Sequence, residues 1–171
     1  PEDLVAIDCY GQPLPSGRPG HDRRPSSEWR LHADVFADRP DAMAVLHCHP
    51  IHATALACHD RGIPPFHYMT AVAGGDDIRC APYATFGTAE LSAHTVQALQ
   101  DRQACLLAHH GLVSLGRDLD QALKIAVEVE TLAQMYLQAL QLGEPPLLSG
   151  SQMEEVHRQF RGLGYGQAAN N

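Results

Sequence analysis

Lysine and long apolar runs are nearly missing from this 171-residue chain. The only lysine, Lys124, falls on the expected solvent face of a helix, whereas Schiff-base chemistry needs a lysine whose pKa is lowered by burial. The sequence therefore argues against carbonyl chemistry through a lysine amine. No apolar segment approaches the ~20 residues that a membrane-spanning helix needs, and the chain does not open on a signal-peptide pattern. We expect no membrane partner.

Basic clusters and cysteine motifs are also missing. The net charge is −8 and no basic run is longer than Arg23-Arg24, so nucleic acid is not an expected partner. The five cysteines are scattered without a C-x-x-C motif, which indicates reduced thiols and a cytoplasmic location rather than a disulfide framework. The remaining composition, 44% hydrophobic and 19% charged, is ordinary for a globular domain.

Strand and helix patterns alternate along the chain, and no internal repeat interrupts them. Strands are expected at residues 3–9, 42–49, 78–81 and 104–108, the last resuming through 111–115. Helices are expected at residues 26–37, 51–60, 88–99, 118–142 and 151–160, and a short extended segment at 64–69. This alternation predicts an α/β sandwich of one domain.

Two histidines stand two residues apart at the end of an apolar run, in Ala44-Val-Leu-His-Cys-His-Pro50. Because alternate side chains of a strand share a face, His47 and His49 would lie side by side, and Pro50 would end the strand. Two adjacent imidazoles cost desolvation free energy unless something satisfies them. The pair therefore predicts half of a metal site.

A second apolar run ends on the doublet His109-His110 and offers a third ligand. Adjacent residues of a strand face opposite ways, so at most one member of the doublet joins the site, and the spacing does not choose between them. Catalytic zinc usually has three protein ligands, histidine or carboxylate, and an open position for water or substrate. The two runs together predict a metalloenzyme.

The residues around these runs have structural interpretations of their own. His52, beyond the proline, is expected at a helix N-terminus. Ser26 or Ser27 is the expected N-cap of the first helix, and Glu28 suits its first turn because a carboxylate complements the helix dipole.

Six collinear motifs, spread over roughly residues 3–142, resemble the zinc-dependent class II aldolase/adducin family. They are Pro25-Ser-Ser-Glu-Trp-Arg30, Val45-Leu-His-Cys-His49, Ile63-Pro-Pro-Phe-His-Tyr-Met69, Cys80-Ala-Pro-Tyr-Ala-Thr-Phe-Gly-Thr88, Leu107-Ala-His-His-Gly-Leu112 and Ala126-Val-Glu-Val-Glu-Thr-Leu-Ala-Gln-Met-Tyr136. The resemblance implies a three-layer α/β sandwich whose central, mainly antiparallel sheet is flanked by helices.

The resemblance also implies a role for each matching residue. His47, His49 and His110 match the zinc ligands, with one Zn²⁺ (or another divalent metal) expected per subunit. Glu28 matches the catalytic acid/base, which also approaches the metal when substrate is absent. This implication reverses the capping interpretation of Glu28.

Further matches imply how substrate is held. Ser26 and Ser27 match residues that bind the substrate phosphate, at a helix N-terminus whose free N–H groups favour an anion. Tyr68 matches a tyrosine that reaches into a neighbouring subunit's site and handles the proton of the aldehyde-derived hydroxyl. Tyr165 is a possible counterpart of the family's C-terminal tyrosine, at a shifted spacing. Family members of this type are cyclic homotetramers with interfacial sites, and we expect the same here.

The activity that the resemblance implies is reversible aldol cleavage of a ketose 1-phosphate, L-fuculose 1-phosphate or a related sugar phosphate, to dihydroxyacetone phosphate and an aldehyde. Sister reactions of the family are alternatives: pentose-phosphate 4-epimerase, methylthioribulose-phosphate dehydratase and sugar-acid-phosphate decarboxylase. A non-catalytic adducin-like module would lack the histidines. A metal-storage or structural-zinc protein would be expected to have a closed four-ligand site.

The expected organisation is a single domain over residues 1–171, in which residues 143–171 form a C-terminal connector, helix and tail. Family members carry about forty-five further residues ahead of the point that matches Pro1, and these form much of the phosphate pocket. The expectation is therefore that this sequence lacks the family's N-terminal segment.

Overall fold

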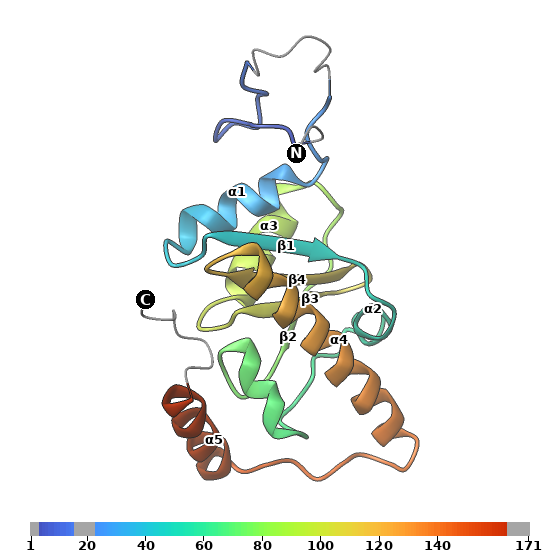
Figure 1. Ribbon diagram of the computed structural model, residues 1–171. Helices are drawn as coiled ribbons and strands as arrows, with labels where there is room; N and C mark the ends of the chain where they lie inside the picture. The colour runs from blue at the N-terminus through green and yellow to red at the C-terminus, as the bar shows by residue number, and fades with distance from the viewer. Residues whose placement is uncertain (1–3, 16–22, 164–171) are drawn as a thin grey trace.

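A four-stranded sheet forms the centre of the computed structural model, which describes residues 4–15 and 23–163 (Figure 1). Its strand order is β1 (Ala44–Cys48), β4 (Gly111–Gly116), β3 (Ala104–Leu107) and β2 (Arg79–Ala81). β4 pairs antiparallel with both β1 and β3, whereas β2 pairs parallel with β3. The expected mainly antiparallel central sheet is confirmed.

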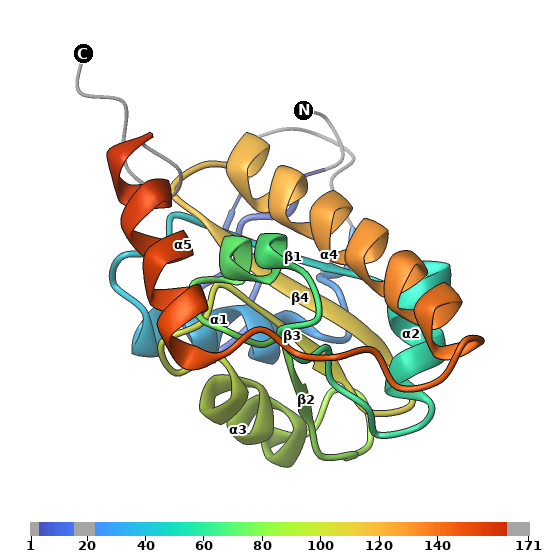
Figure 2. The same cartoon turned by 90° about the horizontal axis from the view of Figure 1, so that it is seen from below.

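Helices cover both faces of the sheet and make it the middle of three layers, as Figure 2 shows. One face carries α1 (Trp29–Asp38) and α3 (Ala89–Ala98). The other carries α2 (Ile51–Ala57), the 3-10 helix η1 (Tyr68–Ala73) and α4 (Leu119–Leu140), and α5 (Gly150–Gly162) packs against η1. The expected α/β sandwich is therefore confirmed.

Two apolar cores lie on the two faces of the sheet, and successive side chains of the central strands β3 and β4 point alternately into one and the other. Leu106 and Leu112 point into the core beneath α2 and α4, whereas Cys105, Leu107 and Val113 point into the core beneath α1 and α3. These side chains are completely buried. Because both faces are covered, β3 reads as a continuous apolar run, and β4 departs from one only at the buried Ser114.

Side-chain caps begin α3 and α4. The Thr88 side chain accepts a hydrogen bond from the Leu91 N–H at the start of α3, and Asp118 does the same for Gln121 at the start of α4. α4 then buries one stripe of side chains at helical spacing: Ala122, Ile125, Ala126, Val129, Leu132, Ala133 and Tyr136.

Three local expectations were wrong. Residues 3–9 form no strand in the part that is described; Ile7 makes only an isolated bridge to Pro13. The segment 64–69 gives way to η1 from Tyr68 onward. Neither Ser26 nor Ser27 is the N-cap of α1, because Glu28 occupies that position and makes no side-chain cap bond. The Ser26 hydroxyl oxygen instead accepts from the Glu28 N–H, 3.2 Å away, so it closes the turn before the helix.

Among the described residues, no helix combines the length and the apolar character that crossing a membrane would require.

Candidate metal centre

The pairing of β1 with β4 brings the histidine motifs together. In the antiparallel register Cys48 lies opposite Leu112, so His49, just after β1, meets the turn that precedes β4. His110 lies in that turn. Glu28, at the start of α1, completes a group of four in which all the potential ligand atoms lie within 4.8 Å of one another.

The distances within this group are those of a compact coordination shell. Nε2 of His47 lies 3.1 Å from Nε2 of His49 and 3.1 Å from Oε2 of Glu28. Nε2 of His110 lies 3.3 Å from Oε1 of Glu28. A tetrahedral ion with bonds of about 2.0–2.1 Å has ligands about 3.3 Å apart. The spacing therefore fits an ion of that size.

Two acceptor atoms of this group lack a hydrogen-bond donor when His47 carries one proton. Nδ1 of His47 lies 2.9 Å from the Leu112 carbonyl oxygen, which can only accept, so this nitrogen carries a proton. With one proton on the ring, Nε2 of His47 presents a lone pair to Oε2 of Glu28, itself an acceptor. Oε1 of Glu28 is buried and makes no hydrogen bond of good geometry among the described residues, although Nε2 of His110 lies 3.3 Å away. A cation held by these atoms resolves both conflicts, so the residues fit a divalent metal.

Burial differs around the group and leaves one side open. The side chains of His47, Glu28 and His110 are 8%, 13% and 14% exposed, whereas His49 is an exposed residue. Desolvation lowers the pKa of His110, with Glu28 opposing and His47 and His49 adding to the effect. His110 is therefore neutral near pH 7, as a metal ligand must be. The cluster is therefore most open to solvent beside His49.

The backbone of the turn, rather than strand geometry, determines which of His109 and His110 joins the cluster. His109 and His110 occupy the turn between β3 and β4 rather than a strand, and His109 has φ +55°. This left-handed residue turns its ring outward, where Nε2 lies 3.7 Å from Oδ1 of Asp60 and the ring meets Tyr83 edge-on. Of the doublet, only His110 joins the cluster.

Gly111 sets how closely the two histidine motifs approach. A Cβ at this position would lie 2.5 Å from the Cys48 carbonyl oxygen and 2.6 Å from Cδ2 of His49. No side chain fits there without moving His49. The glycine is therefore part of the site although it contributes no ligand atom.

The other predicted site residues do not join the cluster in this chain. Ser26 and Ser27 lie in the turn before α1, next to Glu28, and the backbone of Ser27 is approached by Gly87. Tyr68, half exposed at the start of η1, has ring contacts with His67 and Phe160 instead. Tyr165 lies outside the described residues.

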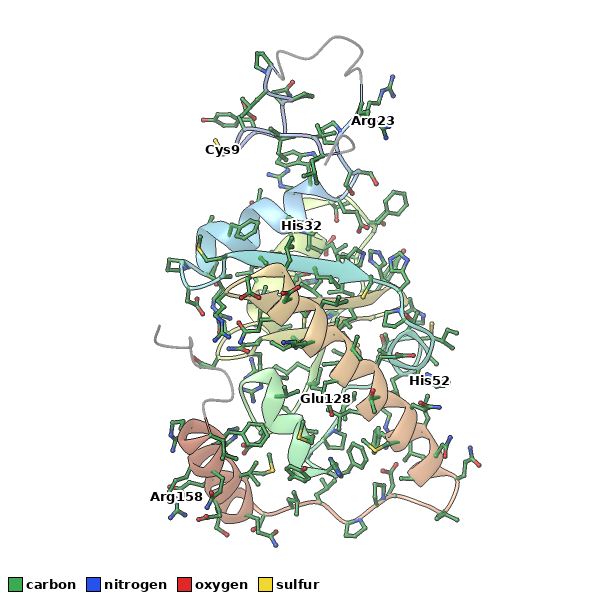
Figure 3. All side chains as sticks on the ribbon, in the orientation of Figure 1. Cys9, Arg23, His32, His52, Glu128 and Arg158 are labelled. Carbon is green, nitrogen blue, oxygen red and sulfur yellow. The ribbon has the colours of Figure 1, made fainter. Side chains whose placement is uncertain are left out.

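Two features of the site were missed by sequence reasoning. His32, one turn beyond Glu28 on α1, bonds the Val45 backbone; its pKa is lowered by burial and by His47, while Glu28 and that bond oppose the shift (Figure 3). Glu130 on α4 bonds the start of α2 beside His49. The i, i+4 spacing of Glu28 and His32 was a usable signal. Nothing local signals Glu130, which is 78 residues from its partner His52.

The three layers and the histidine–carboxylate cluster describe an α/β protein with a candidate metal site, and comparison with known proteins supplies its family. The model of the Class II Aldolase and Adducin N-terminal domain matches residues 1–137. The chain belongs to the class II aldolase and adducin family.

Several relatives in this family are aldolases. The chain is 52% identical over 164 residues to the 5-methylthioribulose-1-phosphate/5-deoxyribulose-1-phosphate aldolase of Rhodospirillum rubrum, covering 96% of this chain and 72% of the relative. It is 49% identical over 150 residues to the L-fuculose phosphate aldolase of Escherichia coli K12, covering 87% and 70%. A solved structure of an L-fuculose 1-phosphate aldolase superposes with a TM-score of 0.86 at 39% identity, covering 94% of this chain and 73% of that one.

Proposed function

We propose that this chain is a metal-dependent aldolase that reversibly cleaves a ketose 1-phosphate to dihydroxyacetone phosphate and an aldehyde. The observation that carries the proposal is the cluster of Glu28, His47, His49 and His110, with its buried carboxylate oxygen that makes no hydrogen bond of good geometry among the described residues. The aldolase relatives supply the reaction class.

His47, His49 and His110 would hold the metal, with Glu28 beside them, and Zn²⁺ is the ion that this donor set favours. A bound divalent ion supplies Lewis-acid stabilisation of the negative charge that develops on the substrate oxygens as the carbon–carbon bond breaks. The single lysine, Lys124, is exposed on α4, outside the cluster, so the Schiff-base alternative has no residue to use.

The chain's own residues move the protons. In the cleavage direction the bond between the two fragments breaks, its electron pair stays with the dihydroxyacetone phosphate fragment, and Glu28 delivers a proton to that carbon as a general acid. The hydroxyl of the other fragment loses its proton as the aldehyde forms, and Tyr68 of a neighbouring subunit would take it. In synthesis both transfers run backwards.

Substrate anchoring falls to the turn before α1. Ser26 and Ser27 would bind the phosphate there, where backbone N–H groups at the helix N-terminus favour an anion. Gly87 supports this arrangement, because a Cβ on it would lie 3.0 Å from the Ser27 carbonyl oxygen and the loop packs directly on the turn.

The choice of sugar lies between two groups of relatives. L-Fuculose 1-phosphate is the first candidate, on the motifs that the chain shares with the fuculose phosphate aldolases. A 5-deoxyribulose 1-phosphate or 5-methylthioribulose 1-phosphate is the second, favoured by the 52% identity to the Rhodospirillum rubrum enzyme.

Assembly into a homotetramer with interfacial sites belongs to the same proposal. It is supported by Tyr68, whose half-exposed ring stands away from the cluster of its own chain, and by apolar side chains exposed along α4. The five cysteines are free thiols, which supports a reducing cytoplasmic location.

The test is elemental analysis for zinc combined with an assay of dihydroxyacetone phosphate release from each candidate sugar phosphate, with and without chelator. We expect about one zinc per chain and chelator-sensitive release from one or both sugars. Zinc without release from either would point to a sister reaction, and a chain that binds no divalent metal would end the proposal.

Replacing the proposed acid/base gives a sharper test. Glu28→Gln keeps the shape of the side chain and should retain most of the metal, but turnover should fall about 10²–10⁴-fold because the proton at carbon has no carrier. Glu128→Gln, on α4 and outside the cluster, is the matched control. Normal turnover by Glu28→Gln would show that the role assigned to Glu28 is wrong.

A further inference from the structure

Glu130, in the middle of α4, accepts hydrogen bonds from the start of α2. Its two carboxylate oxygens lie 2.9 and 3.1 Å from the His52 backbone nitrogen, and Oε2 lies 2.8 Å from the Ala53 nitrogen. Oε1 also lies 2.7 Å from Nδ1 of the His52 ring. The carboxylate is mostly withdrawn from solvent, with 26% of its side chain exposed. One side chain thus holds two backbone groups and an imidazole.

α2 needs this partner because of how it begins. The first N–H groups of a helix have no acceptor within the helix, and a side chain at the N-cap usually supplies one. Here the N-cap is Pro50, which makes no side-chain cap bond. Glu130 takes over the capping from a different helix, and its charge suits the positive end of α2.

The place where Glu130 acts is next to a metal ligand. His49 is joined to α2 through Pro50 alone, and Pro50 has a restricted backbone (φ −72°, ψ 149°). Across residues 4–15 and 23–163, Nδ1 of His49 has no hydrogen bond, whereas the corresponding nitrogen of His47 is held by the Leu112 carbonyl. The direction of the His49 ring therefore depends on the backbone that carries it. Gly111 limits that backbone on one side, and the anchored start of α2 limits it on the other.

We propose that Glu130, together with His52, is a positioning pair that holds His49 in the geometry that the metal requires. The inference rests on the metal centre of the proposed function and adds two residues to it. Neither residue belongs to the four-membered cluster, so each acts through the turn at Pro50 rather than by coordination. Cys48 lies between the two histidines in sequence, and its side chain is on the opposite face of β1. Burial raises the pKa of the Cys48 thiol, and the nearby negative charge of Glu130 raises it further.

The experiment compares zinc affinity and stability in three variants. Glu130→Gln keeps the volume but cannot accept from His52 and Ala53 as a carboxylate does. His52→Leu leaves the backbone cap and removes only the ring bond. Glu128→Gln, two residues earlier on α4 and outside this network, is the control (Figure 3). Zinc affinity is measured by competition with a chromophoric chelator, and melting temperatures are recorded for the metal-free and zinc-loaded proteins.

We expect Glu130→Gln to weaken zinc binding about 10- to 100-fold, the range seen when outer partners of metal ligands are replaced. His52→Leu should lose less, and Glu128→Gln should stay within about twofold. The rise in melting temperature that zinc produces should shrink in Glu130→Gln, which a simple loss of helix stability would not cause.

Unchanged zinc affinity in Glu130→Gln, with a lower melting temperature in both metal states, would show that Glu130 is only a helix cap and would overturn the inference. If Glu130→Gln does not fold, the inference is tested with His52→Leu alone. Unchanged zinc affinity in His52→Leu would then overturn it. Failure of the parent protein to bind zinc would instead overturn the metal centre itself.

Discussion

At the scale of single residues, close contacts fix the positions of the His47 and His49 side chains. His47 is fixed by the Leu112 carbonyl, and Gly111 leaves the His49 ring just enough space. The i, i+2 spacing was sufficient to predict that His47 and His49 would converge, because strand geometry is periodic. The choice of His110 over His109 was not accessible in that way, since it depends on a left-handed backbone at His109 that no periodicity encodes.

Gly111→Ala should therefore damage the candidate metal centre, although it replaces none of the four clustered residues. The added Cβ would meet the Cys48 carbonyl and the His49 ring, and relieving such overlaps costs about 1–3 kcal/mol. We expect lower stability in urea unfolding and weaker zinc binding in chelator competition. Gly150→Ala, whose Cβ would meet nothing within 4 Å, is the matched control. Parental zinc affinity in Gly111→Ala would mean that His49 has more freedom than the structure shows.

At the scale of elements, the cluster depends on how α1 is fixed to the sheet. His32 joins the two layers, because its ring bonds the Val45 backbone in β1 while the helix carries Glu28 one turn earlier. The sequence predicted α1, β1 and most other elements from apolar spacing and caps. It missed η1, and it misplaced the start of α1 because Ser26 bonds Glu28 instead of capping the helix. Such local hydrogen bonds compete with helix caps on nearly equal terms.

His32 should make the metal-free protein sensitive to acid. Burial, the largest cause, lowers its pKa in the folded state below the value of about 6.5 that it has when unfolded. The unfolded chain then binds more protons as the pH falls below about 6.5, so the free energy of unfolding should decrease there.

Urea unfolding of the metal-free protein between pH 7.5 and 5.5 measures this effect. His32→Asn should flatten the dependence on pH, whereas His59→Asn, at an exposed histidine, should keep the parental slope. Equal slopes in all three proteins would show that His32 does not carry the acid sensitivity.

At the scale of the whole molecule, one chain brings together the four residues of the candidate metal centre, and Tyr68 is not among them. α4 exposes Leu119, Leu123 and Val127, which are 74%, 53% and 58% exposed and follow one another at intervals of four residues. Residues so spaced form one stripe along a helix, and exposed apolar stripes mark interaction sites. Sequence periodicity predicts such a stripe as readily as a buried one, so only the fold shows which side is covered.

Leu123→Asp should weaken self-association if this stripe joins subunits. We expect light scattering to show a smaller species than the tetramer proposed for the parent chain, with zinc content retained and turnover reduced because Tyr68 would no longer reach a neighbour. Leu147→Asp, at another exposed leucine in the connector before α5, should leave the mass unchanged. An identical mass for Leu123→Asp and the parent would place the interface elsewhere.

The solitary lysine has one more consequence. Lys124 directly follows Leu123, is exposed on α4 and is not one of the four clustered residues. An amine-reactive fluorophore therefore meets a single side-chain amine, at a defined place beside the apolar stripe. A fluorophore on this one side chain would allow energy transfer between labelled chains to follow their assembly.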